Sequence, residues 1–448
     1  MSRHPTTPVQ PVPFERGQVE EALTRLLPSE KIEQFARETG FIERERKVQP
    51  VAFLWVLVLH FGTRLTRRLA ELKKGYDKRL GLATITYPGW YLRFTPELSK
   101  FLKRCLEHAL GELAHDPGRE LDPKLAAFED IFLKDSTVVR LHASLATKWP
   151  ATRSRKIAAG VKVDTLVSVR ANGPKTVALV GERTPEVKLL RVGPWVKNRI
   201  LLADLGFYSH RLFVKIVENG GSFVSRAKAS ADPLFVRSYT VHRGRAIDLE
   251  GKRLSEVLPR LDRGVLDAEV ELSFKRRVYN GRRAGDTARF RLVAVWDEAH
   301  REYHTYLTNI GPEVLSAEEV ASLYRMRWEI ELTFKELKSQ YALDAFRTTN
   351  ANIVEALVWA ALLTLVASRR LYNLVRARAP PELLPRYTPM MWSIEFREGG
   401  SAVLGCLLAH LGYEEFSEKE WHDVNYRLTV CALTSHIRRT PVREVWSR

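Results

Sequence analysis

The amino-acid sequence predicts an α/β protein in which a sheet-forming region is interrupted by a β-rich insertion and flanked by helical regions. Three observations lead to this fold class. Residues 17–115, and again those after 351, carry apolar side chains at helical spacing. From residue 130, short apolar runs and alternating patterns predict strands around an amphipathic helix. A second group of strand-like runs lies within 229–310 and precedes another helical segment.

The composition favours a protein that binds an acidic polymer. The chain has 448 residues, a net charge of +18 and a hydrophobic content of 45%. Its length suits several domains of about 100–200 residues each, and its apolar content is that of a globular protein. A basic chain of this size favours DNA, RNA or an anionic membrane surface as its partner. A basic protein that binds none of these is the alternative.

The cysteines and the apolar segments favour a reducing compartment and no membrane span. Cys105, Cys406 and Cys431 lie far apart and form no C-x-x-C pair, so neither a zinc ribbon nor a disulfide framework is predicted. The N-terminal residues contain no apolar signal-peptide core. The run 353–368 is shorter than the roughly 20 apolar residues that span a bilayer, so we expect a buried helix there.

The first helical region carries basic faces. It follows a proline-rich tail at 1–16, which we expect to be disordered. The patterns predict a helix that begins near Ser29 and further helices over 51–61, 66–74 and 96–113. Its basic residues include Arg67, Arg68, Lys73, Lys74, Arg93, Lys100, Lys103 and Arg104. Such faces bind nucleic-acid phosphates, and they are equally typical of a solvated basic surface.

The next region predicts a mixed sheet. Its strand-like segments are 130–135, 161–169, 176–180, 199–204 and 222–226. An amphipathic helix at 209–219 lies between the last two of these segments. The segments 130–135 and 199–204 are both apolar runs that finish in an aspartate.

The insertion and the C-terminal region differ in pattern. Within 229–310, strand-like runs occur at 270–274, 289–296 and 303–308, and a polar turn joins the last two. Residues 351–448 are again mostly helical, with turns at prolines and glycines. We therefore expect a β-rich unit inside the sheet-forming region and a helical C-terminal unit.

One helix gathers an unusual set of polar residues. Ser316 and Glu319 fit a capping box, which predicts the start of the helix. With Tyr324 at zero on the helical wheel, Arg327, Glu331 and Lys338 fall at about −60°, −20° and −40°. This stripe borders the apolar face, as expected of side chains that line a cleft. The spacing also suits an ordinary pair on an exposed helix, so geometry alone leaves both interpretations open.

The stripe lacks partner carboxylates, and the two aspartates that follow apolar runs supply them. Asp135 and Asp204 each end a strand-like run, and ligands collect at strand ends in open α/β sheets. If the two strands are neighbours, both aspartates lie together and Glu331 closes the site from the helix. Like charges at short range are unfavourable without a cation. A pair of Mg²⁺ ions relieves this repulsion and activates an oxygen nucleophile for attack on phosphorus.

These residues resemble the motifs of a known enzyme family. Tyr324-x2-Arg327-x3-Glu331-x6-Lys338 is similar to the Y-R-E-K signature of the DDE transposases of bacterial insertion sequences. The run D-L-G-F-Y from Asp204 resembles the second acidic motif of the family, and K-D-S-T around Asp135 resembles the first. The segment 221–226, G-S-F-V-S-R, resembles a G-x-F-V-x-R segment of that family. The matches lie in order across about half of the chain.

The resemblance implies a fold and a site. The catalytic domain of the family is RNase-H-like, and its Asp, Asp and Glu bind two Mg²⁺ or Mn²⁺ ions. By position these residues are Asp135, Asp204 and Glu331. The signature Tyr, Arg and Lys of the family contact DNA phosphates near the cleaved end. These roles imply phosphate contacts for Tyr324, Arg327 and Lys338 in this chain.

The resemblance also implies a layout and partners. We expect a helical DNA-binding domain at 17–122, an RNase-H-like domain at 123–228 and 311–350, the insertion at 229–310 and a helical region at 351–448. The partners are double-stranded DNA, at element ends and at the target, and a second copy of the chain in a synaptic complex. The expected location is the bacterial cytoplasm, with the nucleoid.

Other interpretations remain open. A nuclease of the same fold without strand transfer, or a domesticated DNA-binding protein without activity, also fits the fold. Asp164 lies inside a strand pattern and is interpreted as structural rather than as a ligand. Some relatives stack a flipped base on a tryptophan of the insertion, where this chain has Trp296 and the aromatic strand 303–306. The twelve histidines indicate no zinc site.

Overall fold

The structure is a computed structural model of the whole chain. It describes residues 10–43, 48–63, 68–80, 85–116, 118–152, 158–242, 245–275, 284–343, 346, 348–434 and 442–447. Most of the tail expected to be disordered lies outside these residues, as do Thr66 and Arg67 of the predicted basic helix.

One nine-stranded sheet runs through the molecule in the order β3-β2-β1-β4-β5-β11-β10-β9-β6. In chain order its strands are β1 (Asp130–Leu141), β2 (Ala159–Ser168), β3 (Gly173–Gly181), β4 (Arg199–Ala203), β5 (Ser222–Arg226), β6 (Leu234–Ser238), β9 (Val265–Lys275), β10 (Gly285–Asp297) and β11 (Glu302–Thr308). A separate two-stranded ladder joins β7 (Val241–His242) and β8 (Arg245–Ala246). The expected mixed α/β class is therefore observed.

The centre of the sheet brings the two predicted aspartate strands together. β1 runs antiparallel to β2 and parallel to β4, and β4 runs parallel to β5. The register of β1 and β4 pairs Lys134 with Ala203. Asp135 follows Lys134 on β1, and Asp204 follows Ala203 at the end of β4. The register of these two neighbouring strands therefore sets the two aspartates side by side.

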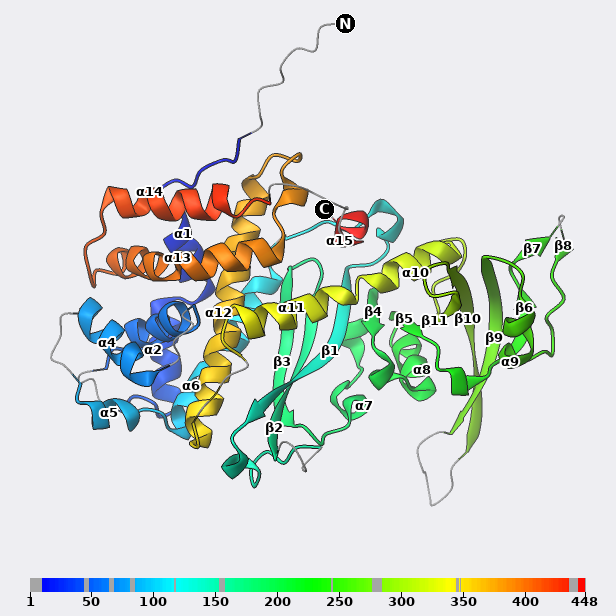
Figure 1. Cartoon of the computed structure of the whole chain (residues 1–448), viewed down its shortest axis with the longest axis horizontal. Helices are drawn as coiled ribbons and strands as arrows, with labels where there is room; N and C mark the ends of the chain where they lie inside the picture. The colour runs from blue at the N-terminus through cyan, green and yellow to red at the C-terminus, as the bar shows by residue number, and fades with distance from the viewer. Residues whose placement is uncertain are drawn as a thin grey trace, which may run out of the picture.

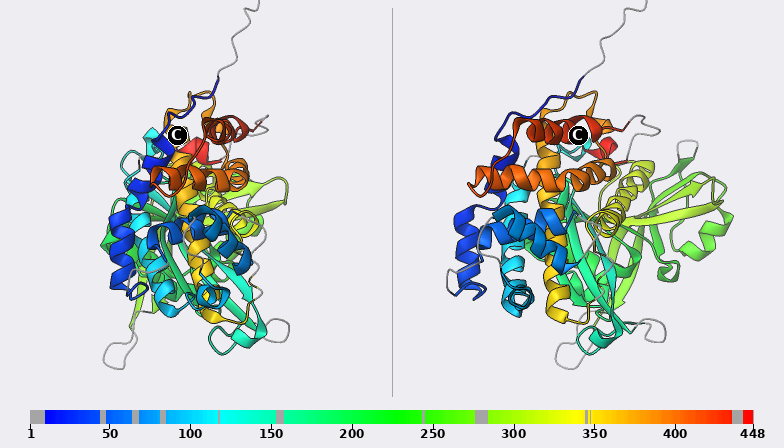
Figure 2. Two further views of the ribbon diagram at one scale, coloured as in Figure 1. Left: turned by 90° about the vertical axis from the view of Figure 1, so that its left-hand side faces the viewer. Right: turned by 60° about the vertical axis from the view of Figure 1, so that its left-hand side comes forward.

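The strands of the insertion extend the central sheet. β11 pairs antiparallel with β5, with Tyr306 opposite Arg226. β10 then pairs with β11, β9 with β10, and β6 with β9. The sequence patterns predict a β-rich insertion here. In the structure its strands continue the main ladder, and they lie at the end of the molecule opposite the N-terminal and C-terminal helices (Figure 1, Figure 2).

Helices form most of the first and last regions of the chain. Before the sheet come α1 (Gln18–Leu26), α2 (Ser29–Glu38), α3 (Pro50–Trp55), the π-helical η1 (Val56–Phe61), α4 (Leu69–Leu80), α5 (Tyr87–Tyr91) and α6 (Pro96–Ala114). After it come α12 (Ala351–Arg378), α13 (Pro389–His410), α14 (Glu418–Tyr426), the π-helical η9 (Arg427–Cys431) and α15 (Val442–Trp446).

The shorter elements lie between the strands or beside them. The helices are α7 (Glu186–Leu189), α8 (His210–Glu218), α9 (Leu254–Val257), α10 (Ala317–Arg325) and α11 (Trp328–Ser339). The 3₁₀ turns are η2 (Pro123–Leu125), η3 (Ala143–Leu145), η4 (Pro194–Val196), η5 (Leu205–Phe207), η6 (Ala229–Ala231), η7 (Leu258–Arg260) and η8 (Leu384–Arg386).

The N-terminal and C-terminal helices pack into one body. The long helix α12 contacts both α6 and α1, and α13 contacts α1 and η1. The backbone of Phe14 exchanges two hydrogen bonds with the side chain of Asn425, at 2.9 and 2.8 Å. Figure 1 shows these helices together at one end of the molecule, opposite the insertion strands. Regions far apart in sequence therefore share one hydrophobic core.

Helix α12 is the buried helix that the apolar run predicts. It is the one described helix long and apolar enough to cross a membrane, but 83% of its most apolar window is buried inside the protein. Its apolar side chains, from Ile353 to Leu371, belong to the main core. In this fold the helix is a core element.

The predicted helix from Ser316 to Lys338 is two helices. The capping box is present, because the Ser316 hydroxyl accepts from the Glu319 amide and the Glu319 carboxylate accepts from the Ser316 amide. At Met326 and Arg327 the backbone amides bond to carbonyls three residues back, which tightens the chain and separates α10 from α11. The apolar periodicity continues through this junction, so the sequence pattern does not reveal it.

Candidate active site

Asp135 lies within strand β1 and not at its end. The apolar run stops at Leu133, which suggested a strand end, but β1 continues to Leu141. The β-branched residues Thr137, Val138 and Val139 favour this continuation, which pairs with β2 along its length. The side chain of Asp135 is 17% exposed, so it is held at the floor of the site.

Asp204 follows β4 directly, as predicted, and starts the 3₁₀ turn η5. The turn lies close to α7, because a Cβ added at Gly206 would lie 1.8 Å from a carboxylate oxygen of Glu186 and that side chain would have to move. The Asp204 side chain is 43% exposed and faces the open side of the site. Its position therefore depends on the strand register and on the close approach of α7.

Arg327 brings the three predicted acids together. Its guanidinium lies 2.6 Å from Glu331 Oε1, 3.7 Å from Asp135 Oδ2 and 3.9 Å from Asp204 Oδ1. The junction between α10 and α11 places Arg327 at this point, and Glu331 follows one turn later on α11. Three carboxylates thus surround one cation, two from neighbouring strands and one from the helix that covers them.

The electrostatics of the cluster reflect shared negative charge. Burial raises the pKa of Asp135 to about 6, and the nearby charge of Asp204 adds to the rise, while Arg327 opposes it. One guanidinium cannot neutralise three carboxylates. Three carboxylates offer oxygen ligands, and such a set suits a hard divalent cation.

Tyr324 and Lys338 lie on the same two helices. Tyr324 is only 6% exposed, and its hydroxyl donates to the carbonyl oxygen of Ala203 at 3.4 Å. Its ring lies 5.2 Å from that of Tyr306, and burial raises its pKa to about 12. Lys338 lies two turns beyond Glu331 on α11 and is partly exposed.

Two further residues adjoin the cluster, and sequence reasoning missed the first of them. Glu186, at the start of α7, accepts a hydrogen bond of 2.8 Å from Ser136 Oγ and contributes to the raised pKa of Asp135. No motif marks it, because it comes from a loop that reaches the site only in the fold. Trp328 follows Arg327 directly, and 56% of its surface is exposed to solvent. A large aromatic side chain is therefore exposed next to the residue that contacts the three acids.

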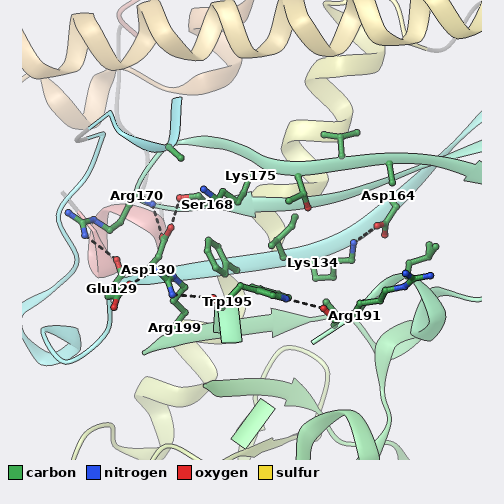
Figure 3. A pocket seen from close by; sticks show the side chains of 18 of the residues that line it. Glu129, Asp130, Lys134, Asp164, Ser168, Arg170, Lys175, Arg191, Trp195 and Arg199 are labelled. Carbon is green, nitrogen blue, oxygen red and sulfur yellow. Dashed lines mark hydrogen bonds and ion pairs between the residues drawn. The ribbon is translucent and has the colours of Figure 1, made fainter. Parts of the chain in front are cut away.

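Asp164 has the structural position that the sequence predicts. It is 6% exposed on β2 and forms an ion pair with the buried Lys134. Both residues line a hollow of about 790 Å³, together with Trp195 (Figure 3). Asp135, Asp204 and Glu331 do not line it. Other charges of this hollow are also paired, such as Arg199 with Glu129.

The sequence of the chain matches a family of known proteins over this region. Residues 126–367 match the family described as "Transposase DDE domain". This range is more than half of the chain and contains all three acids and both signature helices. The chain belongs to this family. It is an enzyme of the DDE transposase class, of the kind found in insertion sequences.

Named relatives agree with this assignment. The transposase is 22% identical over 387 residues to the transposase for insertion sequence element IS231F of Bacillus thuringiensis subsp. israelensis, covering 77% of this chain and 78% of that protein. It is 18% identical over 374 residues to the transposase for IS1151 of Clostridium perfringens, covering 75% and 77%.

Among solved structures, a piggyBac transposase synaptic complex with hairpin DNA covers 96% of this chain and 89% of its own, at 11% identity and a TM-score of 0.46.

Proposed function

We propose that this transposase cleaves DNA at the ends of its insertion sequence and joins the 3′ hydroxyls to target DNA. The observation that carries the proposal is the convergence of Asp135, Asp204 and Glu331 on one guanidinium. Phosphoryl transfer needs carboxylates that hold divalent cations beside a phosphate. The membership in the DDE transposase family supports the reaction class.

Asp135, Asp204 and Glu331 would hold two Mg²⁺ ions, and Mn²⁺ would substitute. Bound there, the ions would activate an oxygen nucleophile and stabilise the leaving oxygen. Arg327 would then release the carboxylates and turn towards a DNA phosphate, which it can grip with two parallel N–H bonds. Lys338 would add a point charge further along the same phosphate backbone. Tyr324 would position the turn that carries Arg327 and donate to a phosphate when the site opens.

The rest of the chain would support DNA in this site. We propose an RNase-H-like domain at 123–228 and 311–350, a DNA-binding helical domain at 17–122, a β-rich insertion at 229–310 and a helical region at 351–448. The strand order β3-β2-β1-β4-β5 supports the first of these. The net charge of +18 supports binding to the ends and to the target. A homodimer would bring two ends together.

Single substitutions of the acids test the catalytic assignment. Asp135→Asn, Asp204→Asn and Glu331→Gln should each abolish cleavage of element-end DNA in Mg²⁺, because each removes a ligand charge but keeps the side-chain shape. DNA binding, measured by mobility shift, should be largely retained. Glu329→Gln on the same helix is the matched control and should cleave normally. Normal cleavage by any of the three acid variants would contradict the assignment.

A strand-transfer assay with precut ends separates the remaining alternatives. Joined products support the transposase reaction. Cleavage without joining would indicate a nuclease. Binding without either reaction, in Mg²⁺ and in Mn²⁺, would indicate a domesticated DNA-binding protein.

A further inference from the structure

A second cluster of ligand-type side chains lies in the turn between β10 and β11. Asp297 ends β10, and His300 and His304 follow in the turn and in β11. One donor atom from each of these three residues lies within 4.8 Å of the other two. His300 and His304 form an H-x3-H pair, which the sequence prediction of no zinc site among the histidines left unassigned.

The turn aims one carboxylate oxygen at both imidazole rings. Asp297 Oδ1 accepts from the backbone amides of Ala299 at 2.9 Å and of His300 at 3.3 Å, which fixes the carboxylate. Its other oxygen, Oδ2, lies 2.9 Å from His300 Nδ1 and 2.9 Å from His304 Nε2. The side chains of Asp297 and His304 are 27% and 23% exposed, whereas that of His300 is 71% exposed, so solvent reaches the cluster from the His300 side.

We propose that Asp297, His300 and His304 bind a Zn²⁺-type transition-metal ion. Two imidazole nitrogens and one carboxylate oxygen are ligands that Zn²⁺ accepts, with water in the fourth position. Mg²⁺ is a poor match for this set because it prefers oxygen ligands in an octahedron. The site is independent of the acidic cluster and of the reaction proposed for it.

The outer partners of His304 give the proposal a specific consequence. His304 Nδ1 accepts from Arg226 Nη2 at 2.8 Å, so the proton of the neutral ring is on Nε2. A metal at Nε2 requires the proton on Nδ1. Nδ1 then donates to Glu302, whose Oε1 lies 3.8 Å away, and loses the bond from Arg226. Metal binding and the Arg226 contact therefore exclude each other.

The location of the turn gives the ion a role in the fold. β11 joins the insertion to the central sheet through β5, and Arg226 is the last residue of β5. Tyr306, opposite Arg226, packs against Tyr324 of α10. An ion in the turn would lock the hairpin and free a guanidinium beside the tyrosines that adjoin the acidic cluster.

Zinc titration of the full-length protein tests the site. The protein is stripped with chelator and titrated with Zn²⁺ by calorimetry in excess Mg²⁺, and Co²⁺ absorption reports the ligand geometry. We expect one saturable site. His300→Ala or His304→Ala should weaken Zn²⁺ binding by more than the roughly 10–100-fold drop in affinity that follows mutation of a residue hydrogen-bonded to a metal ligand. His142→Ala, which removes an exposed histidine elsewhere, is the control. Equal Zn²⁺ affinity in wild type and the two cluster variants, or no saturable site, would overturn the proposal.

Substitutions of Arg226 and Glu302, the two residues beside His304 Nδ1, distinguish a metal site from an ordinary ion pair. Arg226→Met should strengthen Zn²⁺ binding because it removes the competing hydrogen bond. Glu302→Gln should weaken it about 10–100-fold because it removes the charged acceptor for Nδ1. The Asp135→Asn/Glu331→Gln double variant should bind Zn²⁺ as wild type does. Zn²⁺ should raise the melting temperature of wild type but not of His304→Ala. Unchanged affinity in both the Arg226 and the Glu302 variant, or loss of the site in the double variant, would contradict the assignment.

Discussion

Arg327 occupies the place where the three acids need positive charge. It lies within 4 Å of Asp135, Asp204 and Glu331 at once, and its side chain is only 16% exposed. A cation that binds the acids must displace this contact. If the acids hold metal as proposed, Arg327 would compete with it for the carboxylates, in addition to its proposed role at a DNA phosphate.

This competition predicts a metal-dependent stability effect. Without divalent ions, Arg327→Ala should lower the free energy of unfolding by about 1–3 kcal/mol, because it leaves three carboxylates without their shared cation. Mg²⁺ should then raise the melting temperature of Arg327→Ala more than that of wild type, by mass action. Arg327→Lys keeps the charge and should fall between the two.

Arg325→Ala is the control, since it removes an exposed arginine two residues away. Thermal unfolding with and without Mg²⁺ measures all four proteins. Equal Mg²⁺-induced shifts in Arg327→Ala and wild type would mean that Arg327 does not compete for the acids.

At the scale of elements, a buried ion pair anchors the helix that carries Glu331. Glu336 of α11 and Arg369 of α12 form a pair in which the side chains are 1% and 3% exposed. The pair joins the helix over the sheet to the central helix of the helical body. The orientation of α11 therefore depends on a contact outside the site.

Breaking this pair should be more harmful than replacing it. Glu336→Gln should lower the free energy of unfolding by about 3–5 kcal/mol, because Arg369 is left buried without its counter-charge. The double variant Glu336→Leu/Arg369→Met should recover most of that loss. Urea denaturation of the three proteins checks the order. A single variant as stable as wild type would show that the pair does not anchor α11.

The elements also show what sequence reasoning can reach. Asp204 after β4 and the capping box at Ser316 were predicted because their signals are local: an apolar run that ends in an acid, and a hydroxyl three residues before a carboxylate. The position of Asp135 inside β1 was missed because the polar residues 134–137 interrupt the apolar run while the ladder to β2 continues. The pairing of β5 with β11 is a long-range contact, and no local pattern encodes it.

The break at Arg327 was missed for a related reason. Helical periodicity records which side chains face the core, and the short 3₁₀ turn between α10 and α11 keeps the same apolar face inward. Proximity of Tyr324, Arg327 and Glu331 was therefore predictable, whereas the convergence of all three acids on Arg327 depends on the junction and on the strand register together.

At the scale of the whole molecule, the net charge of +18 predicts salt-dependent DNA binding. If about 6–10 phosphates are contacted, affinity for end DNA should fall roughly 10³–10⁵-fold between about 50 and 200 mM salt. Lys100, Lys103 and Arg104 of α6 are exposed. If this helix faces DNA, replacing all three with alanine should reduce the slope of log affinity against log salt concentration by up to about three. An unchanged slope with an unchanged melting temperature would exclude α6 from the interface.

The hydrogen bonds between Phe14 and Asn425 join positions 411 residues apart. During synthesis, the ribosome releases the first helices long before their packing partners α12 and α13 exist. Until then the apolar faces of those helices stay exposed, which favours binding by chaperones and cleavage by proteases. A chain that lacked α13 would leave the apolar faces that pack against it on α1 and η1 uncovered, which favours aggregation and proteolysis.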